Sequence, residues 1–160
     1  MTYSRSQDSP DRRAEFPQTD LRGSIDGLLN AFYQGTSKEA ARYDLTTHEF
    51  NLLSACLKRK EECTATELAR VLPVDASRIS RIVTILVDRG LLKRRRLPSD
   101  RRVVMLSLSE EGVELTTRIL RRINRNSARL MEGIDEDEIH IFTSVVSRIV
   151  TNHDAIQNSE

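Results

Sequence analysis

The sequence has no tryptophan, few aromatic residues and only two cysteines, and these shortages narrow the functions open to it. With aromatics at 4% of residues, it lacks the stacking platforms on which proteins bind single-stranded nucleic acid. Two cysteines, Cys56 and Cys63, are too few for a disulfide framework. We therefore expect free thiols in a reducing compartment.

Long apolar runs and catalytic motifs are missing as well. No run approaches the length that crosses a membrane, and the N-terminal segment lacks the apolar middle of a secretory signal, so we expect a cytoplasmic protein. There is no nucleophile elbow, phosphate-binding loop or dinucleotide fingerprint. His48, His140 and His153 are scattered without metal-ligand spacing. The sequence predicts a protein that is not an enzyme and has no metal site or cofactor.

Positive charge is concentrated in the middle of a chain whose net charge is only +1. Residues 70–102 contain ten Lys or Arg and three Asp, a net charge of +7, which leaves −6 for the remainder. Five arginines fall in the stretch RRRLPSDRR at 94–102. A basic middle between acidic flanks is typical of a nucleic-acid contact surface, although an isolated charge run can also be a merely solvated face.

Local signals predict a series of helices separated by caps and turns. Residues 1–19 have no periodicity and are expected to form a flexible arm. Thr46 and Glu49 have capping-box spacing for a helix running to about Lys58, and Thr64 and Glu67 repeat that spacing for a short helix ended by Pro73. A longer helix follows from Asp75 to Gly90, which completes a helix-turn-helix pattern.

The outward face of that longer helix suits a DNA major groove. Ile79, Ile82, Val83 and Leu86 share the core side at about 100° per residue. On the other side we expect a set of small hydroxyls and arginines that can approach base edges and phosphates. These predicted recognition residues are Ser77, Arg78, Ser80, Arg81 and Thr84. An ordinary solvated helix face is the competing interpretation, because helix-turn-helix spacing arises easily by chance.

Two runs of strand length follow, LLKRRRL and VVMLSLS, and they predict a β-hairpin. Pro98, Ser99 and Asp100 supply turn material between them. A basic hairpin after a recognition helix is a wing, whose arginines can follow phosphates or enter a minor groove. The predicted wing contacts are Arg94, Arg95, Arg96, Asp100, Arg101 and Arg102. Asp100 is expected to orient an arginine, and its competing role is that of a plain turn residue.

The chain resembles the MarR family of winged helix-turn-helix transcriptional regulators. The resemblance rests on the stretch TELARVLPVDASRISRIVTILVDRGLLKRRRLPSDRRVVMLSLSEEG. The helix-turn-helix, the RGLLKR entry to the wing, the D-R-R tip and the LSLSEEG run occur in the family's order, and the resemblance covers roughly residues 45–120 closely. It implies that Asp100 orients Arg102 for a minor groove. It also implies a homodimer that binds duplex DNA, commonly as a repressor released by a small ligand.

The ends of the chain suit dimerisation. Ser109 caps a long predicted helix, and Asp135 with Glu138 caps a final helix whose apolar stripe is too wide for a surface helix. A second apolar stripe near the N-terminus is its expected partner across a two-fold axis, unless both stripes bury within one monomer. The predicted dimerisation residues are Leu21, Ile25, Leu28, Phe32, Phe142, Val146 and Ile149.

The expected fold is mainly α with a small β-hairpin wing, between N- and C-terminal dimerisation helices. We expect the arm at 1–19, an N-terminal dimerisation region at 20–44, the winged helix-turn-helix at 45–108, and the long helix and dimerisation helix at 109–160. The predicted function is sequence-specific binding of a pseudo-palindromic operator. A winged-helix module whose basic face binds an acidic protein is the alternative. Cys56 and Cys63 could sense oxidants if one had a lowered pKa, but inert buried thiols are the simpler expectation.

Overall fold

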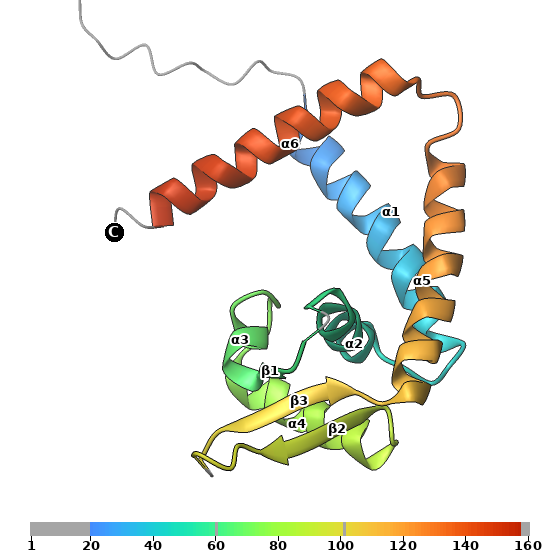
Figure 1. The fold of residues 1–160 in the computed structure, drawn as a ribbon. Helices are drawn as coiled ribbons and strands as arrows, with labels where there is room; N and C mark the ends of the chain where they lie inside the picture. The colour runs from blue at the N-terminus through green and yellow to red at the C-terminus, as the bar shows by residue number, and fades with distance from the viewer. Residues whose placement is uncertain (1–19, 60, 101, 158–160) are drawn as a thin grey trace, which may run out of the picture. The chain divides into compact units, whose positions relative to one another are not determined.

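The computed structural model describes residues 20–59, 61–100 and 102–157. The chain divides into two compact units, one ending at Gln34 and the other beginning at Gly35. The expected arm at 1–19 lies outside the described residues. The elements, drawn in Figure 1, are α1 (Leu21–Ala41), α2 (Thr47–Arg59), β1 (Cys63–Thr64), α3 (Ala65–Ala69), α4 (Ala76–Asp88), β2 (Leu92–Arg96), β3 (Val104–Leu108), α5 (Glu110–Leu130) and α6 (Glu136–Gln157).

Short-range capping sets where the helices begin, as the sequence predicted. The Thr46 amide donates to Glu49 Oε2 at 2.7 Å and the Glu49 amide donates to Thr46 Oγ1 at 3.2 Å, which closes a capping box before α2. Thr64 and Glu67 form the same box before α3. Ser109 accepts from the Gly112 amide at 2.9 Å and so caps α5.

Three antiparallel strands form the sheet, in the order β1-β3-β2. The predicted hairpin is confirmed as β2 and β3, with Leu92 opposite Leu108 and Arg96 opposite Val104. In Figure 1 the tip of this hairpin projects past the helices. The two-residue β1, which pairs Cys63 with Leu106, was not predicted, because two residues carry no periodicity.

One hydrophobic core lies between the sheet and helices α2 to α5 of the second unit. The predicted inner face of α4 is confirmed, since Ile79, Ile82, Val83 and Leu86 are all buried. α5 joins through Ile119, which is fully buried. Gly112 lets α5 approach the chain before β2, because a Cβ there would lie 2.1 Å from the Leu91 carbonyl oxygen. The leucine and isoleucine side chains with almost no exposure are Leu52, Leu53, Leu68, Ile79, Leu86, Leu106 and Ile119.

The long helix α6 takes no part in that core. None of its residues is buried. In the described ranges no helix is both long and apolar enough to span a bilayer. The fold class is nevertheless the predicted one, mainly helical with a small sheet carrying the wing.

Candidate nucleic-acid interface

The predicted recognition helix α4 is held firmly at both ends. At its start Asp75 accepts from the Arg78 amide at 2.8 Å. Hydrogen bonds from Ser77 and from that amide hold the pKa of Asp75 below its ordinary value, so the cap stays ionised at neutral pH. At its end Gly90 has φ of +72°, a conformation that favours glycine. The helix is therefore a rigid platform for its outward side chains.

All five predicted recognition residues on α4 are exposed. Two of their hydroxyls are engaged locally, since Ser77 Oγ donates to Asp75 Oδ1 at 2.6 Å and Thr84 Oγ1 donates to the Ser80 carbonyl at 3.1 Å. Among the described residues no ion pair involves the side chains of Arg78 or Arg81. The two arginines are thus available to reach an anionic or hydrogen-bonding partner.

At the other end of α4, Arg89 joins this helix to the turn between α1 and α2. Its Nη1 donates to the Asp44 carbonyl at 2.6 Å and its Nη2 donates to the Tyr43 carbonyl at 3.0 Å. Asp44 has φ of +54° in this turn. No local sequence pattern indicates this contact, because 45 and 46 residues separate the partners. Arg89 fixes the end of the outward-facing helix against the preceding part of the fold.

The wing arginines do not form the uniform patch that the sequence suggested. Arg95 makes a bidentate ion pair with Glu62, with its Nε 2.7 Å from Oε1 and its Nη2 on Oε2. The same pairing lowers the pKa of Glu62. Arg94 and Arg96 alternate with Arg95 along β2 and so project from the opposite face. One of the predicted wing contacts is therefore already paired within the chain.

At the wing tip Asp100 holds the backbone of Arg102. Asp100 Oδ1 accepts from the Arg102 amide at 2.9 Å, and the Val103 amide donates to the Asp100 carbonyl at 3.0 Å. The sequence predicts that Asp100 contacts an arginine side chain. The observed hydrogen bonds instead join Asp100 to the backbone amides of Arg102 and Val103 and so shape a turn. Arg101, another predicted contact, lies outside the described residues. If Asp100 positions Arg102, it does so through the turn.

This geometry gives a sharp test of the wing. We expect Asp100→Ala and Arg102→Ala each to weaken binding to A·T-flanked duplex DNA by about 1 kcal/mol, because a lost turn acceptor and a lost groove contact are both small terms. Asp100→Asn should retain most of the affinity, since its side-chain oxygen still accepts the Arg102 amide. The measurement is the dissociation constant of each variant at one fixed salt concentration.

The double variant Asp100→Ala with Arg102→Ala supplies the control for this wing test. If the aspartate acts through the arginine, the double variant should lose little more affinity than Arg102→Ala alone. Simple electrostatics predicts the opposite sign for Asp100→Ala, because removing a negative charge favours phosphates. Tighter binding by both Asp100→Ala and Asp100→Asn would contradict the positioning role.

A buried carboxylate connects the end of α1 to α5. Glu39 is 3% exposed and accepts from Arg122 Nε at 2.7 Å and from Asn126 Nδ2 at 3.1 Å. Arg42 lies 3.5 Å away as a second cation. The Arg122 hydrogen bond outweighs burial and holds the pKa of Glu39 below its ordinary value. This network, also unforeseen in the sequence, fixes the frame on which the helix-turn-helix sits.

We expect Glu39→Gln to lower the free energy of unfolding by about 1–2 kcal/mol at pH 7, since charge-assisted hydrogen bonds become neutral and Arg122 is partly exposed. Because the folded pKa of Glu39 is depressed, its contribution is present above the unfolded pKa and is lost as pH falls through the folded value. The difference in unfolding free energy between wild type and variant should therefore narrow below the unfolded pKa and close only when the pH is below the folded value. Urea unfolding at pH 7 and at a series of acidic pH values measures it.

Glu114→Gln is the matched control for Glu39→Gln. Glu114, like Glu39, pairs with an arginine of α5. Its Oε1 lies 2.5 Å from Arg118 Nη2 one turn along the same helix, but its side chain is 72% exposed. An exposed pair of this kind contributes little, so a change under about 0.5 kcal/mol is expected. Equal effects from the two substitutions would show that burial of Glu39 is not what matters.

The two cysteines do not meet the requirement for a fast oxidant sensor. Both are buried, and burial is the main cause that raises the pKa of each thiol. Neither thiol therefore has the lowered pKa that makes a cysteine react rapidly with oxidants at neutral pH. No group of three or more His, Cys, Asp or Glu side chains suited to a metal ion lies within the described ranges.

The predicted dimerisation residues all lie on the surface of the chain, in α1 and α6. Each is more than a third exposed, with Phe142 at 46% and Ile149 at 54%. Other exposed apolar residues accompany them on the same two helices, namely Leu29, Tyr33, Ile141, Val145, Val150 and Ile156. Such extensive apolar exposure is unusual for a monomer.

Comparison with known proteins agrees with this geometry. Residues 43–103, which contain the helix-turn-helix and the first strand of the wing hairpin and end just before β3, match the MarR family. This stretch of the chain is similar to a MarR-family domain. YdcH of Bacillus subtilis (strain 168), an uncharacterised HTH-type transcriptional regulator, is 35% identical over 86 residues, which cover 52% of this chain and 58% of YdcH. The chain therefore matches less than two thirds of that relative.

Two solved structures share the MarR-family fold over most of the chain. A mutant MarR from E. coli complexed with operator DNA has a TM-score of 0.70 and 21% identity, covering 81% of this chain and 92% of its own. A putative MarR family transcriptional regulator from Listeria monocytogenes complexed with 26mer DNA has a TM-score of 0.72 and 22% identity, covering 83% and 88%. At these identities the likeness shows the fold alone.

Proposed function

We propose that this protein is a homodimeric transcriptional regulator that reads duplex DNA by sequence. The observation that carries the proposal is the exposed Arg78 and Arg81 on a helix fixed at both ends, next to a projecting basic hairpin. A helix of this kind suits a major groove, and a basic wing suits the adjoining backbone and minor groove. Two proteins of the same fold are complexed with DNA, which supports the proposal.

The homodimer is the second part of the proposal. Apolar side chains on α6 that no other part of the second unit covers need a partner, and a second copy supplies the same surface by two-fold symmetry. We propose that the stripe from Leu21 to Phe32 joins the interface. Two recognition helices would then face two half-sites of a pseudo-palindromic operator. We further propose that the regulator is a repressor released by a small ligand.

A selection from the protein's own genome tests this function. We expect fragments retained by the full chain to share a palindromic site, and binding to a duplex with that site to survive a large excess of random competitor DNA. Specific binding by such proteins exceeds non-specific binding by about three orders of magnitude or more. Binding that disappears with competitor would contradict sequence reading. It would favour the alternative, a winged-helix module that binds an acidic protein.

A further inference from the structure

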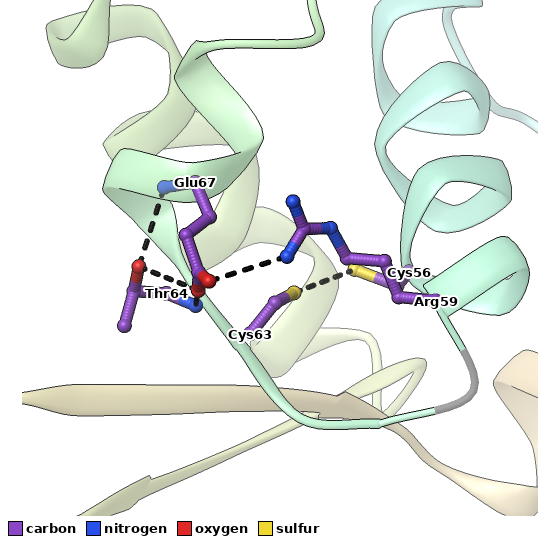
Figure 2. A network of polar contacts seen from close by, with 5 residues as sticks. All are labelled: Cys56, Arg59, Cys63, Thr64 and Glu67. Atoms are coloured by element: carbon purple, nitrogen blue, oxygen red, sulfur yellow. Dashed lines mark hydrogen bonds and ion pairs between the residues drawn. The ribbon is translucent and has the colours of Figure 1, made fainter.

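Both cysteines of the chain meet inside the core of the helix-turn-helix. Cys56 lies in the last turns of α2, and Cys63 begins β1. Their Sγ atoms are 3.9 Å apart, which is van der Waals contact, and the side chains are 5% and 0% exposed. Figure 2 shows Cys63 pointing toward Cys56, with Arg59 reaching from α2 to Glu67. The chain contains no other cysteine that either could pair with.

We propose that Cys56 and Cys63 are a regulatory thiol pair that a small neutral hydroperoxide closes to an intramolecular disulfide, weakening DNA binding. A disulfide needs an S–S distance of about 2.05 Å, so the two sulfurs must approach by about 1.9 Å. The formation of the bond stands on this geometry alone. Its effect on DNA rests on the function proposed above.

The surroundings of the two sulfurs give the order of the chemical steps. Burial raises the pKa of both thiols and the charge of Arg59 opposes the rise at both, but at Cys63 the hydrogen bond with Cys56 opposes it as well. At Cys56, by contrast, the contact with Cys63 adds to it. Cys63 therefore ionises first. Its thiolate attacks the peroxide, the O–O bond breaks, and an alcohol or water leaves with the proton, so that Cys63 becomes a sulfenic acid.

Cys56 then resolves this intermediate. Its sulfur attacks Cys63 Sγ, the S–O bond breaks, and water leaves with the thiol proton. Overall, two thiols and one hydroperoxide give one disulfide, one alcohol or water, and one further water. The two sulfurs lose two electrons and the peroxide gains them. Contact between the sulfurs in the reduced state makes this second step fast relative to further oxidation of Cys63.

Burial selects the oxidant. A small neutral hydroperoxide can reach sulfurs beneath the surface during brief local openings, whereas a bulky charged disulfide such as oxidised glutathione is excluded. Since the thiolate is the reactive form and its pKa is raised, closure is slow at neutral pH and should accelerate steadily as pH rises from 7 to 9. An exposed cysteine would instead level off near its ordinary pKa of about 8.5.

Closure acts on the first helix of the helix-turn-helix through the residue next to Cys63. Thr64 caps α3, accepting from the Glu67 amide at 3.2 Å and donating its own amide to Glu67 Oε2 at 2.7 Å. Glu67 also pairs with Arg59, with Nη1 and Oε1 3.3 Å apart. These contacts appear together in Figure 2. Drawing Cys63 toward α2 displaces this cap, and with it the packing of α3 beneath α4.

The first experiment counts thiols in the full-length protein. After hydrogen peroxide, denaturation and alkylation, we expect a chain that has lost two hydrogens and takes no alkyl group, without covalent dimers on a non-reducing gel. Dithiothreitol should restore two alkylations. Oxidised glutathione at the same concentration should close the pair at least tenfold more slowly. Two reactive thiols after peroxide, stable sulfinic acid, or a disulfide between chains would overturn the proposal.

The second experiment asks what closure does to DNA binding. Oxidised wild type should bind its selected duplex at least tenfold more weakly than the same sample after dithiothreitol, while Cys56→Ala and Cys63→Ala should bind equally with and without peroxide. Because the comparison is made within wild type, it does not depend on how well the variants fold. Unchanged affinity of the closed protein would overturn the regulatory role. If the reduced protein binds no duplex, the proposed function fails, and the thiol count still decides whether the bond forms.

Discussion

Phe142→Asp and Ile149→Asp should each convert the protein from a dimer to monomers. Both side chains lie on α6, exposed at 46% and 54%, in the stripe proposed as the interface. Burying a carboxylate without a partner costs several kcal/mol, and a two-fold axis places every substitution in the interface twice. Since about 1.4 kcal/mol corresponds to tenfold in affinity, the dimer dissociation constant should rise by at least two orders of magnitude.

The control for these variants is Ser144→Asp. Ser144 is an exposed residue of the same helix and projects from the side opposite the apolar stripe, so it adds the same charge outside the proposed interface. Light scattering over a concentration series should show a dimer for wild type and Ser144→Asp and a monomer for the other two. The monomers should stay folded, because α6 contributes nothing to the core of the second unit.

A dimer in both stripe variants would place the interface elsewhere, and unfolding of either would show that α6 supports the monomer. The same variants can be tested for DNA binding, and the two-fold symmetry of the proposed dimer predicts the result. A monomer presents one recognition helix, so it should retain affinity for a half-site and lose the gain from occupying two half-sites at once. Ser144→Asp should bind the full palindrome as wild type does.

The sequence predicted those features of the fold that depend on neighbours within one helical turn. The capping boxes at Thr46 and Thr64 and the buried face of α4 are set by spacings of three or four residues, so each is legible in the chain. Strand β1 escaped because it exists only by pairing with Leu106, far along the sequence. α1 extends to Ala41, past the last residue of the stripe that predicted it.

The charged contacts of the site needed the structure for the same reason. Nothing near Glu62 indicates that it binds Arg95, which is 33 residues away, so the sequence predicts Arg95 as a wing contact like its neighbours. The Asp100 contact is local: Asp100 accepts from the backbone amide of Arg102, because a short side chain two residues away reaches an amide more easily than a guanidinium. The resemblance to the MarR family implied Arg102 as the partner, and the short side chain of Asp100 meets the amide of that residue.

Arg81→Ala should weaken binding to the selected palindrome by about 1–3 kcal/mol and change binding to random duplex much less. Arg81 projects from the exposed face of α4, and among the described residues it makes no ion pair that would compete with DNA. A free guanidinium at this place can make a bidentate contact with a guanine edge in the major groove. Affinities for both duplexes at one salt concentration give the specificity ratio directly.

Arg81→Lys separates base reading from charge. Lysine keeps the positive charge but cannot reproduce the fork of two parallel donors, so it should lose nearly as much specific affinity as alanine if Arg81 reads a base. If Arg81 contacts a phosphate instead, lysine should bind almost as wild type, and alanine should weaken specific and random binding alike. Arg125→Ala removes the same charge from exposed α5, outside the helix-turn-helix, and should leave the specificity ratio unchanged. Equal losses on both duplexes for Arg81→Ala, with lysine restoring them, would move this residue from recognition to backbone contact.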